Sequence, residues 1–195
     1  HFTSVTGETL CEECIAGEFT AAIAASDCIQ CTNGWYHGVS GQTVCLECPV
    51  GQFRNSLGQT RCTLCARGKY QGSTGSTHCL DCPAGEYTGV EGLSECLSCP
   101  VGVITASDGE SVCIECVAGE YAGSEGLSEC TECAAGWYGT SNGTSVCTKC
   151  EPGHFTSVTG ETLCEECIAG EYTAAIEASD CIQCTNGWYH GVSGQ

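Results

Sequence analysis

A single aromatic position recurs along this chain at a constant spacing, and the intervals are rich in cysteine, glycine and polar residues. An aromatic residue returns every 17 positions, from Phe19 and Tyr36 to Tyr189, with Ile104 as the exception and Phe2 as a first, isolated member. Leu, Ile, Val and Phe are otherwise sparse, so the chain lacks the material for a sizeable hydrophobic core. The pattern predicts a small β-hairpin around each aromatic position.

Each 17-residue unit contains the parts of a hairpin. The first strand carries the aromatic residue, as at 18–20 and 52–54. A polar turn follows, as at 55–58, and its glycine readily adopts the positive φ that tight turns need. The second strand is expected to run into the next cysteine, as at 42–45 and 59–62. A repeat this short cannot bury an apolar face alone, so it needs cross-links and neighbouring repeats.

The 22 cysteines provide the cross-links. All of them lie in eleven Cys-x-x-Cys pairs, whose first members run from Cys11 to Cys181 in steps of 17, and a glycine lies three residues after each pair. The period predicts ten full repeats over residues 11–180, with partial repeats at 1–10 and 181–195.

A longer period is superimposed on the short one. Residues 154–195 nearly copy residues 1–42, and the two segments differ only at the positions of Tyr172 and Glu177. The near-copied block indicates array expansion by duplication. We therefore expect the chain to be a window on a longer repetitive protein.

The Cys-x-x-Cys pairs support three interpretations. Two pairs could bind one zinc ion through four thiolates, but such sites need two repeats per metal, and alternate repeats do not differ in this sequence. A redox motif is a single pair at a strand end in a βαβ fold, whereas here the pair recurs without any βαβ pattern. We therefore expect a structural disulfide array with no metal and no cofactor.

Regularity restricts how the cysteines pair. If all repeats are equivalent, the smallest offsets lie within one pair or between successive pairs, and bridges within Cys-x-x-Cys are typically strained or reducible. Bridges between successive pairs would leave Cys11 and Cys184 to partners outside the chain. A crosswise scheme, Cys11–Cys28 with Cys14–Cys31, stays open as an alternative with a two-repeat period. The favoured pairs are Cys14–Cys28, Cys31–Cys45, Cys48–Cys62, Cys65–Cys79, Cys82–Cys96, Cys99–Cys113, Cys116–Cys130, Cys133–Cys147, Cys150–Cys164 and Cys167–Cys181.

Charge narrows the choice of partners. The formal net charge is −19 with five Lys and Arg residues, so nucleic acids and anionic membranes, which require clustered cations, are not expected to bind. No Asp-rich calcium loop and no apolar run of 18 residues occurs. The five histidines are scattered, and no Ser/His/Asp or Cys/His constellation indicates an enzyme.

Three repeats begin with the motifs "CPVGQF", "CPAGEY" and "CPVGVI". These motifs resemble the cysteine-rich repeat of ephrin receptors and are similar to the first half-module of tumour-necrosis-factor-receptor repeats. The resemblance implies a C-shaped, two-stranded turn closed by one disulfide, with Gly51 in the tight turn and Phe53 packed on the Cys48–Cys62 bridge. Receptor ectodomains mix such modules with others, whereas here they are uniform and tandem.

These features predict a small disulfide-rich β fold, in which tandem hairpin repeats form an elongated solenoid-like rod. The expected function is a structural extracellular fibre protein of a cell-surface filament, hair or coat that self-associates. A ligand-binding receptor ectodomain or adhesin stalk and a metal-binding cysteine-rich protein are the alternatives. Trp35, Trp137 and Trp188 are candidates for lateral contact or glycan binding, since neighbours on a strand face opposite sides. Asn142 begins the one N-glycosylation sequon.

Overall fold

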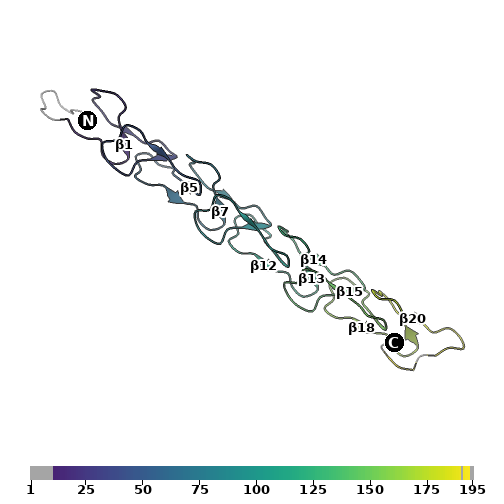
Figure 1. Cartoon of the computed structure of the whole chain (residues 1–195). Helices are drawn as coiled ribbons and strands as arrows, with labels where there is room; N and C mark the ends of the chain where they lie inside the picture. The colour runs from purple at the N-terminus through teal and green to yellow at the C-terminus, as the bar shows by residue number, and fades with distance from the viewer. Residues whose placement is uncertain (1–10, 190, 194–195) are drawn as a thin grey trace. The chain divides into compact units, whose positions relative to one another are not determined.

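Residues 11–189 and 191–193 are described by a computed structural model of the chain (Figure 1). Their regular secondary structure consists of two-residue strands paired into antiparallel hairpins, and no helix occurs among them. The first strands of the hairpins are β1 (Glu18–Phe19), β3 (Trp35–Tyr36), β5 (Gln52–Phe53), β7 (Lys69–Tyr70), β9 (Glu86–Tyr87), β11 (Val103–Ile104), β13 (Glu120–Tyr121), β15 (Trp137–Tyr138), β17 (His154–Phe155) and β19 (Glu171–Tyr172). The second strands are β2 (Ile29–Gln30), β4 (Leu46–Glu47), β6 (Thr63–Leu64), β8 (Leu80–Asp81), β10 (Leu97–Ser98), β12 (Ile114–Glu115), β14 (Thr131–Glu132), β16 (Thr148–Lys149), β18 (Glu165–Glu166) and β20 (Ile182–Gln183).

The structural repeat is a module that runs from the second cysteine of one pair to the residue before the second cysteine of the next pair, for example residues 14–30. In that module Phe19 pairs with Ile29 and Glu18 with Gln30. The same register recurs in the hairpins β3–β4, β5–β6, β7–β8, β11–β12, β13–β14, β15–β16, β17–β18 and β19–β20. The predicted fold class, disulfide-rich β-hairpin repeats, is confirmed. Phe2 and the partial repeat at 1–10 lie outside the described residues.

The second strand lies elsewhere than the sequence pattern predicted. It consists of the two residues between the cysteines of each Cys-x-x-Cys pair, as in β4, and the expected strand at 42–45 was wrong. The backbone of that segment pairs with the preceding module instead: the Gln42 carbonyl accepts a hydrogen bond from the Thr20 N–H at 3.2 Å, and Phe19 and Gln42 form a parallel bridge. Backbone groups before each cysteine are therefore satisfied between modules.

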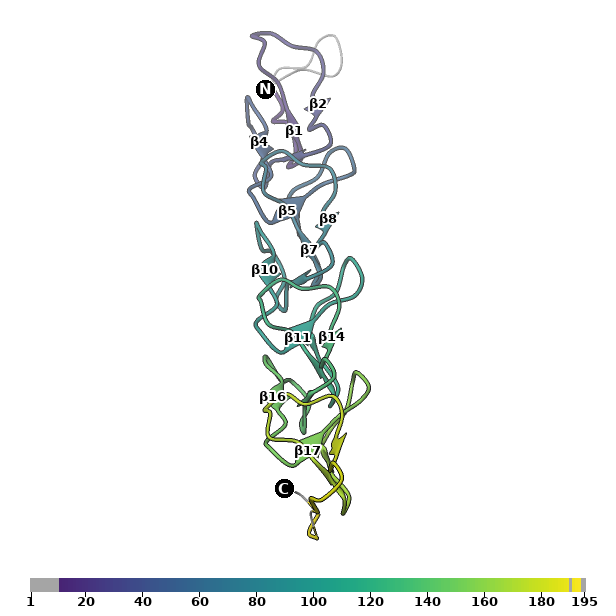
Figure 2. The ribbon, with the colours of Figure 1, turned by 90° about the vertical axis from the view of Figure 1, so that its right-hand side faces the viewer.

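The chain divides into two compact units, which are described separately. Unit 1 consists of His1–Cys82, Tyr87–Leu97 and Gly109–Val112, and unit 2 consists of Pro83–Glu86, Ser98–Asp108 and Cys113–Gln195. Within unit 1, successive modules are joined by backbone hydrogen bonds, such as Gly51 N–H to the Gln71 carbonyl at 2.7 Å and Gly75 N–H to the Cys48 carbonyl at 2.8 Å. In Figure 2, β7 lies directly below β5, which belongs to the preceding module of this unit.

Unit 2 repeats the same scheme with different residues. The Gly102 N–H donates to the Ala122 carbonyl at 2.9 Å, and the Ala122 N–H donates to the Thr144 carbonyl at 3.1 Å. The Gly143 N–H donates to the Cys116 carbonyl at 2.8 Å. Because these bonds use backbone groups, modules of different sequence associate in the same way.

Few side chains are buried, as expected for a chain with so little apolar material. The buried set consists mainly of disulfide cysteines and of the residue that follows each aromatic position. Buried residues at that second position are Thr20, His37, Gln71, Thr88, Thr105, Ala122, Thr156 and Thr173. Large apolar side chains such as Ile23 and Leu163 are exposed. Covalent bridges and backbone hydrogen bonds therefore supply much of the stability that a hydrophobic core supplies in other domains.

Candidate functional site

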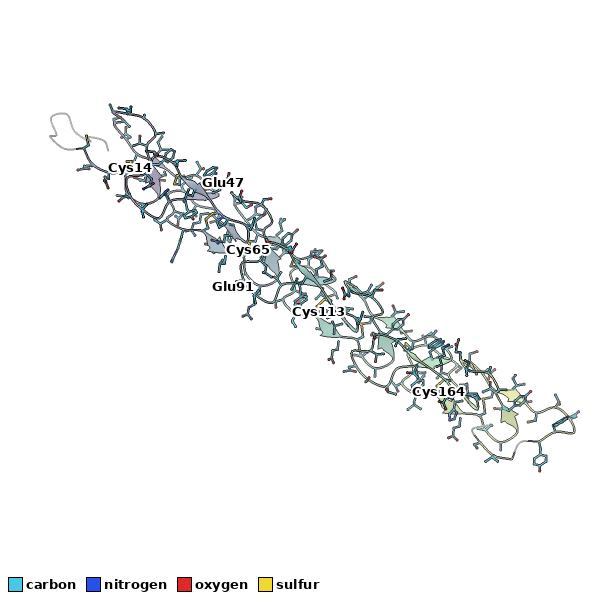
Figure 3. The ribbon with its side chains drawn as sticks, viewed as in Figure 1. Cys14, Glu47, Cys65, Glu91, Cys113 and Cys164 are labelled. Carbon is cyan, nitrogen blue, oxygen red and sulfur yellow. A yellow bond between two sulfur atoms is a disulfide. The ribbon has the colours of Figure 1, made fainter. Side chains whose placement is uncertain are left out.

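The feature common to all described modules is a ladder of ten disulfides (Figure 3). Each bridge joins the second cysteine of one pair to the first cysteine of the next, from Cys14–Cys28 to Cys167–Cys181, over 14 residues of sequence. The Cα atoms of each bridge lie 5.7 to 5.9 Å apart. The structure thus places bridges between successive pairs, neither within a pair nor crosswise.

Cys11 and Cys184 are the cysteines without a disulfide in the described part of the chain. They are the two that a bridge of this offset leaves over. In the same part of the chain, no group of three or more His, Cys, Asp or Glu side chains is placed to hold a metal ion. Twenty of the 22 cysteines thus form the disulfide ladder.

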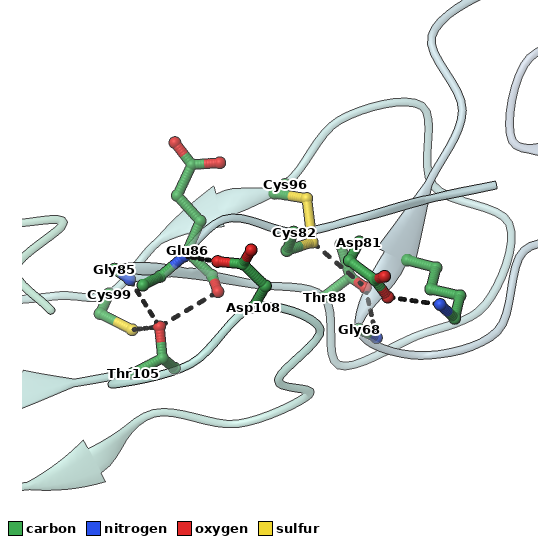
Figure 4. Close-up of a disulfide and its surroundings, with 12 residues drawn as sticks. Gly68, Asp81, Cys82, Gly85, Glu86, Thr88, Cys96, Cys99, Thr105 and Asp108 are labelled. Carbon is green, nitrogen blue, oxygen red and sulfur yellow. Dashed lines mark hydrogen bonds and ion pairs between the residues drawn. A yellow bond between two sulfur atoms is a disulfide. The ribbon is translucent and has the colours of Figure 1, made fainter.

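A buried threonine lies beside the disulfide in several modules, and the sequence pattern did not reveal this position. Figure 4 shows Thr88, whose hydroxyl accepts a hydrogen bond from the Gly68 N–H at 2.8 Å and lies 3.9 Å from the Cys82 sulfur. Thr105 is placed in the same way, at 2.8 Å from the Gly85 N–H. The sequence carries one signal for this position, a threonine directly after the aromatic position in several repeats.

At eight of the described positions, the glycine three residues after a pair is required by a close approach between modules two repeats apart. Gly102 has a φ of +84°, and a Cβ on it would lie 2.1 Å from the Gly143 carbonyl oxygen, which a side chain cannot tolerate. Gly170 has a φ of +90° but nothing within 4 Å of its Cβ position. Both glycines supply positive φ, but only Gly102 is also held by packing. Substitution at Gly170 would therefore incur only the strain of positive φ, whereas substitution at Gly102 would incur that strain and also disrupt the contact with Gly143.

The second recurrent glycine, in the turn, is replaced at two described positions. Ala24 and Glu177 occupy it with φ values of +58° and +63°. Glu177 forms an ion pair with Lys149, which lies two modules earlier. In other modules the residue corresponding to Lys149 is often acidic and lies against the turn glycine, as Glu115 does against Gly143. Lys149 thus stands where other modules often have a carboxylate. It faces Glu177, the one described case in which the turn glycine is replaced by an acidic residue.

The aromatic position packs toward the following module. Ile104, which replaces the aromatic residue, is 7% exposed and clusters with Cys116 and Ala122 of the next module. Phe53 lines a groove with Lys69 and Cys79, also of the next module. The same groove is lined by Thr63 and Leu64 of Phe53's own module, and the packing of Phe53 on the Cys48–Cys62 bridge stays a prediction. The apparent gap at Ile104 in the series of aromatic rings is a packed position.

The three tryptophans occupy one wall of such grooves, opposite the aromatic residue of the preceding module. Trp35 shares a groove of about 170 Å³ with Phe19, and Trp137 shares one of about 230 Å³ with Tyr121. Trp35 and Trp137 are half-buried like the tyrosines that follow them. A role of these tryptophans in lateral contact stays a prediction. Trp188 is 80% exposed and lies in a third groove.

Asn142 lies exposed in a turn, as the sequon suggested. Its Oδ1 accepts a hydrogen bond from the Ala118 N–H at 3.0 Å, and the Thr144 hydroxyl donates to the Ser141 carbonyl at 2.8 Å. The carboxylate of Asp108 accepts a bond from the Ala84 N–H at the corresponding place. The side-chain nitrogen of Asn142, to which a glycan would attach, has no hydrogen bond within the described residues.

Comparison with known proteins identifies these modules. The family model described as tyrosine-protein kinase ephrin type A/B receptor-like matches residues 21–60, 51–92, 77–112 and 119–163, which together cover more than half of the chain. The chain belongs to the ephrin-receptor-like family of cysteine-rich repeats. The family expected from the cysteine and glycine motifs is confirmed.

Ephrin-receptor-like repeats are non-catalytic, disulfide-rich modules. No curated protein matches the chain significantly. Among the residues that the structure describes, no helix has the length and apolar character needed to cross a bilayer. The family assignment thus rests on the modules themselves, and their shared geometry is the feature from which function has to be inferred.

Proposed function

We propose that this chain is a segment of a structural extracellular protein whose disulfide-laddered repeats bear load along a cell-surface filament, hair or coat. The observation that carries the proposal is the uniform offset of the ten bridges. A force applied to the chain ends passes through each disulfide and then through one Cys-x-x-Cys link. The loop closed by each bridge is bypassed.

Uniformity supports a structural role over a site-based one. Every described bridge has the same sequence separation, and the joining hydrogen bonds use backbone atoms that all modules possess. Such an array tolerates changes in module number, since each module contacts only its near neighbours. The nearly copied segment at 154–195 supports growth by duplication. The role of the array is then to span a distance that is set by the number of modules.

An extracellular location follows from the same chemistry. Disulfides persist in oxidising compartments such as the cell exterior, and are rare in the cytosol. Asn142 is exposed with its side-chain oxygen already held by Ala118, which leaves its nitrogen open to a glycan. We infer that Asn142 is N-glycosylated. Partners of the array are further copies of itself, and glycans are the second class that its exposed aromatic residues suit.

Immunogold electron microscopy of the source cells tests the proposal. Antibodies raised against the oxidised 195-residue chain should label extracellular filaments or a coat along their length. Label restricted to the plasma membrane, with none on any extended structure, would contradict a fibre role. A second sample should be treated with a thiol reductant before fixation. The labelled filaments should lose their order in that sample, because their disulfides bear the load.

A ligand-binding ectodomain or adhesin stalk is the second candidate, and the tryptophan grooves favour it. Trp35 and Trp137 face aromatic residues of the preceding module across pockets with apolar walls, a composition common to small-molecule sites. The test is binding to a glycan array. Binding that disappears in Trp35→Ala with Trp137→Ala, but persists in Phe53→Ala, whose groove has no tryptophan, would support this function over the fibre.

A further inference from the structure

Charge is segregated along the chain in a way that the net value of −19 conceals. Residues 48–80 contain four of the five Lys and Arg residues and no Asp or Glu. The segment that follows, residues 81–132, contains eleven of the 24 Asp and Glu residues and no Lys or Arg. We call these the basic segment and the acidic segment. A basic island of this kind is unusual in an acidic chain and indicates a specific electrostatic contact.

Two cations of the basic segment are available for such a contact. Arg54 hydrogen-bonds to Thr63 and Gln59 within its own module, and Lys69 pairs with Asp81. By contrast, Arg61 and Arg67 are exposed and form no ion pair or side-chain hydrogen bond within the described residues. Exposed guanidinium groups of this kind bind carboxylates well, because their planar fork matches two oxygens.

The acidic segment offers the complementary groups. Nine of its eleven carboxylates are exposed, and Glu86 and Glu120 are half-buried. Glu125 and Glu129 are exposed four residues apart within one module, and neither forms an ion pair in the described part of the chain.

We propose that the basic segment of one copy docks on the acidic segment of a second copy. The inference rests on the proposed filament function and deepens it by naming the lateral contact. Because each copy carries both segments, the contact is between unlike surfaces. Contacts of that type do not close on themselves in general, and they produce open assemblies.

Salt has a characteristic effect on this contact. Two copies of net charge −19 repel at very low ionic strength, whereas the screening distance of about 8 Å near 0.15 M removes most of that long-range repulsion. Close Arg–carboxylate pairs survive there and are weakened in higher salt. Association is therefore strongest at intermediate ionic strength, which distinguishes it from purely apolar aggregation.

Sedimentation velocity of the oxidised 195-residue chain tests the contact. The parent should associate with increasing concentration near about 0.15 M salt and dissociate as salt is raised. Arg61→Gln with Arg67→Gln should weaken association about tenfold, since two solvent-exposed ion pairs, each individually weak, are lost. The matched control is Ala21→Glu with Ala22→Glu, which changes the net charge equally at exposed positions outside both segments. This control should behave like the parent.

A charge-swap pair makes the test specific. A copy with Arg61→Glu and Arg67→Glu should not associate with itself, but should associate with a copy carrying Glu125→Arg and Glu129→Arg. Peptide mapping without reduction confirms that each variant retains its ten disulfides. A parent that stays monomeric at every salt concentration overturns this contact, as does an arginine variant that associates like the parent. Immunogold label on filaments would leave the fibre role standing in either case.

Discussion

Reduction of the disulfides should lengthen the chain severalfold under tension. Between Cys14 and Cys184 lie ten bridges and ten Cys-x-x-Cys links. With Cα atoms 5.7 Å apart across a bridge and about 3.5 Å per extended residue in each link, the oxidised path is about 160 Å long. The same 170 residues extend to about 600 Å once every bridge is broken. Each bridge therefore hides about 43 Å of chain.

Single-molecule force spectroscopy measures this length directly. With handles at the chain ends, the oxidised chain should stop lengthening near the shorter value, and addition of a thiol reductant should produce steps of about 43 Å, one per bridge. The variant Cys99→Ser with Cys113→Ser is the matched control, since it lacks one bridge. It should begin about 43 Å longer and show one step fewer.

The alternative pairings give different lengths. Bridges within Cys-x-x-Cys pairs would hide only a few ångströms each, so the oxidised chain would approach the length of the reduced chain. Large extension without reductant, or steps much smaller than about 43 Å, would refute the load path on which the proposed function depends.

Three further predictions concern packing, modification and charge. Gly102→Ala should speed local amide exchange by about 5- to 150-fold more than Gly170→Ala, because both incur the strain of positive φ but only Gly102 meets a backbone carbonyl; equal effects would argue against the contact. Asn142→Asp should abolish N-glycosylation, seen as a mass loss, while its oxygen still accepts from Ala118, so that unchanged exchange there would support the assigned roles. Lys149→Gln should destabilise the Glu177 turn by about 0.5–1 kcal/mol at low salt, because it loses the ion pair and the contact with the Trp137 ring. Adding Glu177→Gly should restore stability in denaturant titrations, since glycine relieves the positive φ.

The disulfide pairing followed from the sequence because the period left few choices. When all repeats are equivalent, one bridge fixes the others, and a Cys-x-x-Cys bridge is disfavoured by strain. The hairpin and the aromatic strand were also accessible, since Phe19 and its neighbours stand out in a chain with few apolar residues. Local chemistry and regularity favoured these features but left the crosswise pairing of the cysteines open.

Contacts between modules could not be predicted from the sequence in the same way. The second strand was predicted at the wrong residues. The segment at 42–45 forms a backbone hydrogen bond with the preceding module, through Gln42, and not with the first strand of its own hairpin. The packing role of Gly102 depends on Gly143, 41 residues away, and the sequence showed only that both are glycine. Likewise, nothing local indicates that Lys149 meets Glu177. Sequence periodicity reveals what each module contains, but not which modules meet.

The spacing of those contacts determines how the array resists stretching and bending. A bridge such as Cys99–Cys113 fixes distances within a module, whereas Gly102 and Gly143 fix the approach of modules two repeats apart. If bridges alone joined the modules, each Cys-x-x-Cys link would be free to pivot, and the ladder would resist stretching but not bending. The close glycine contacts restrain that pivot without side chains, so the surface stays free to vary in charge. A chain built this way can carry a basic segment beside an acidic one and still keep the same backbone geometry throughout each unit.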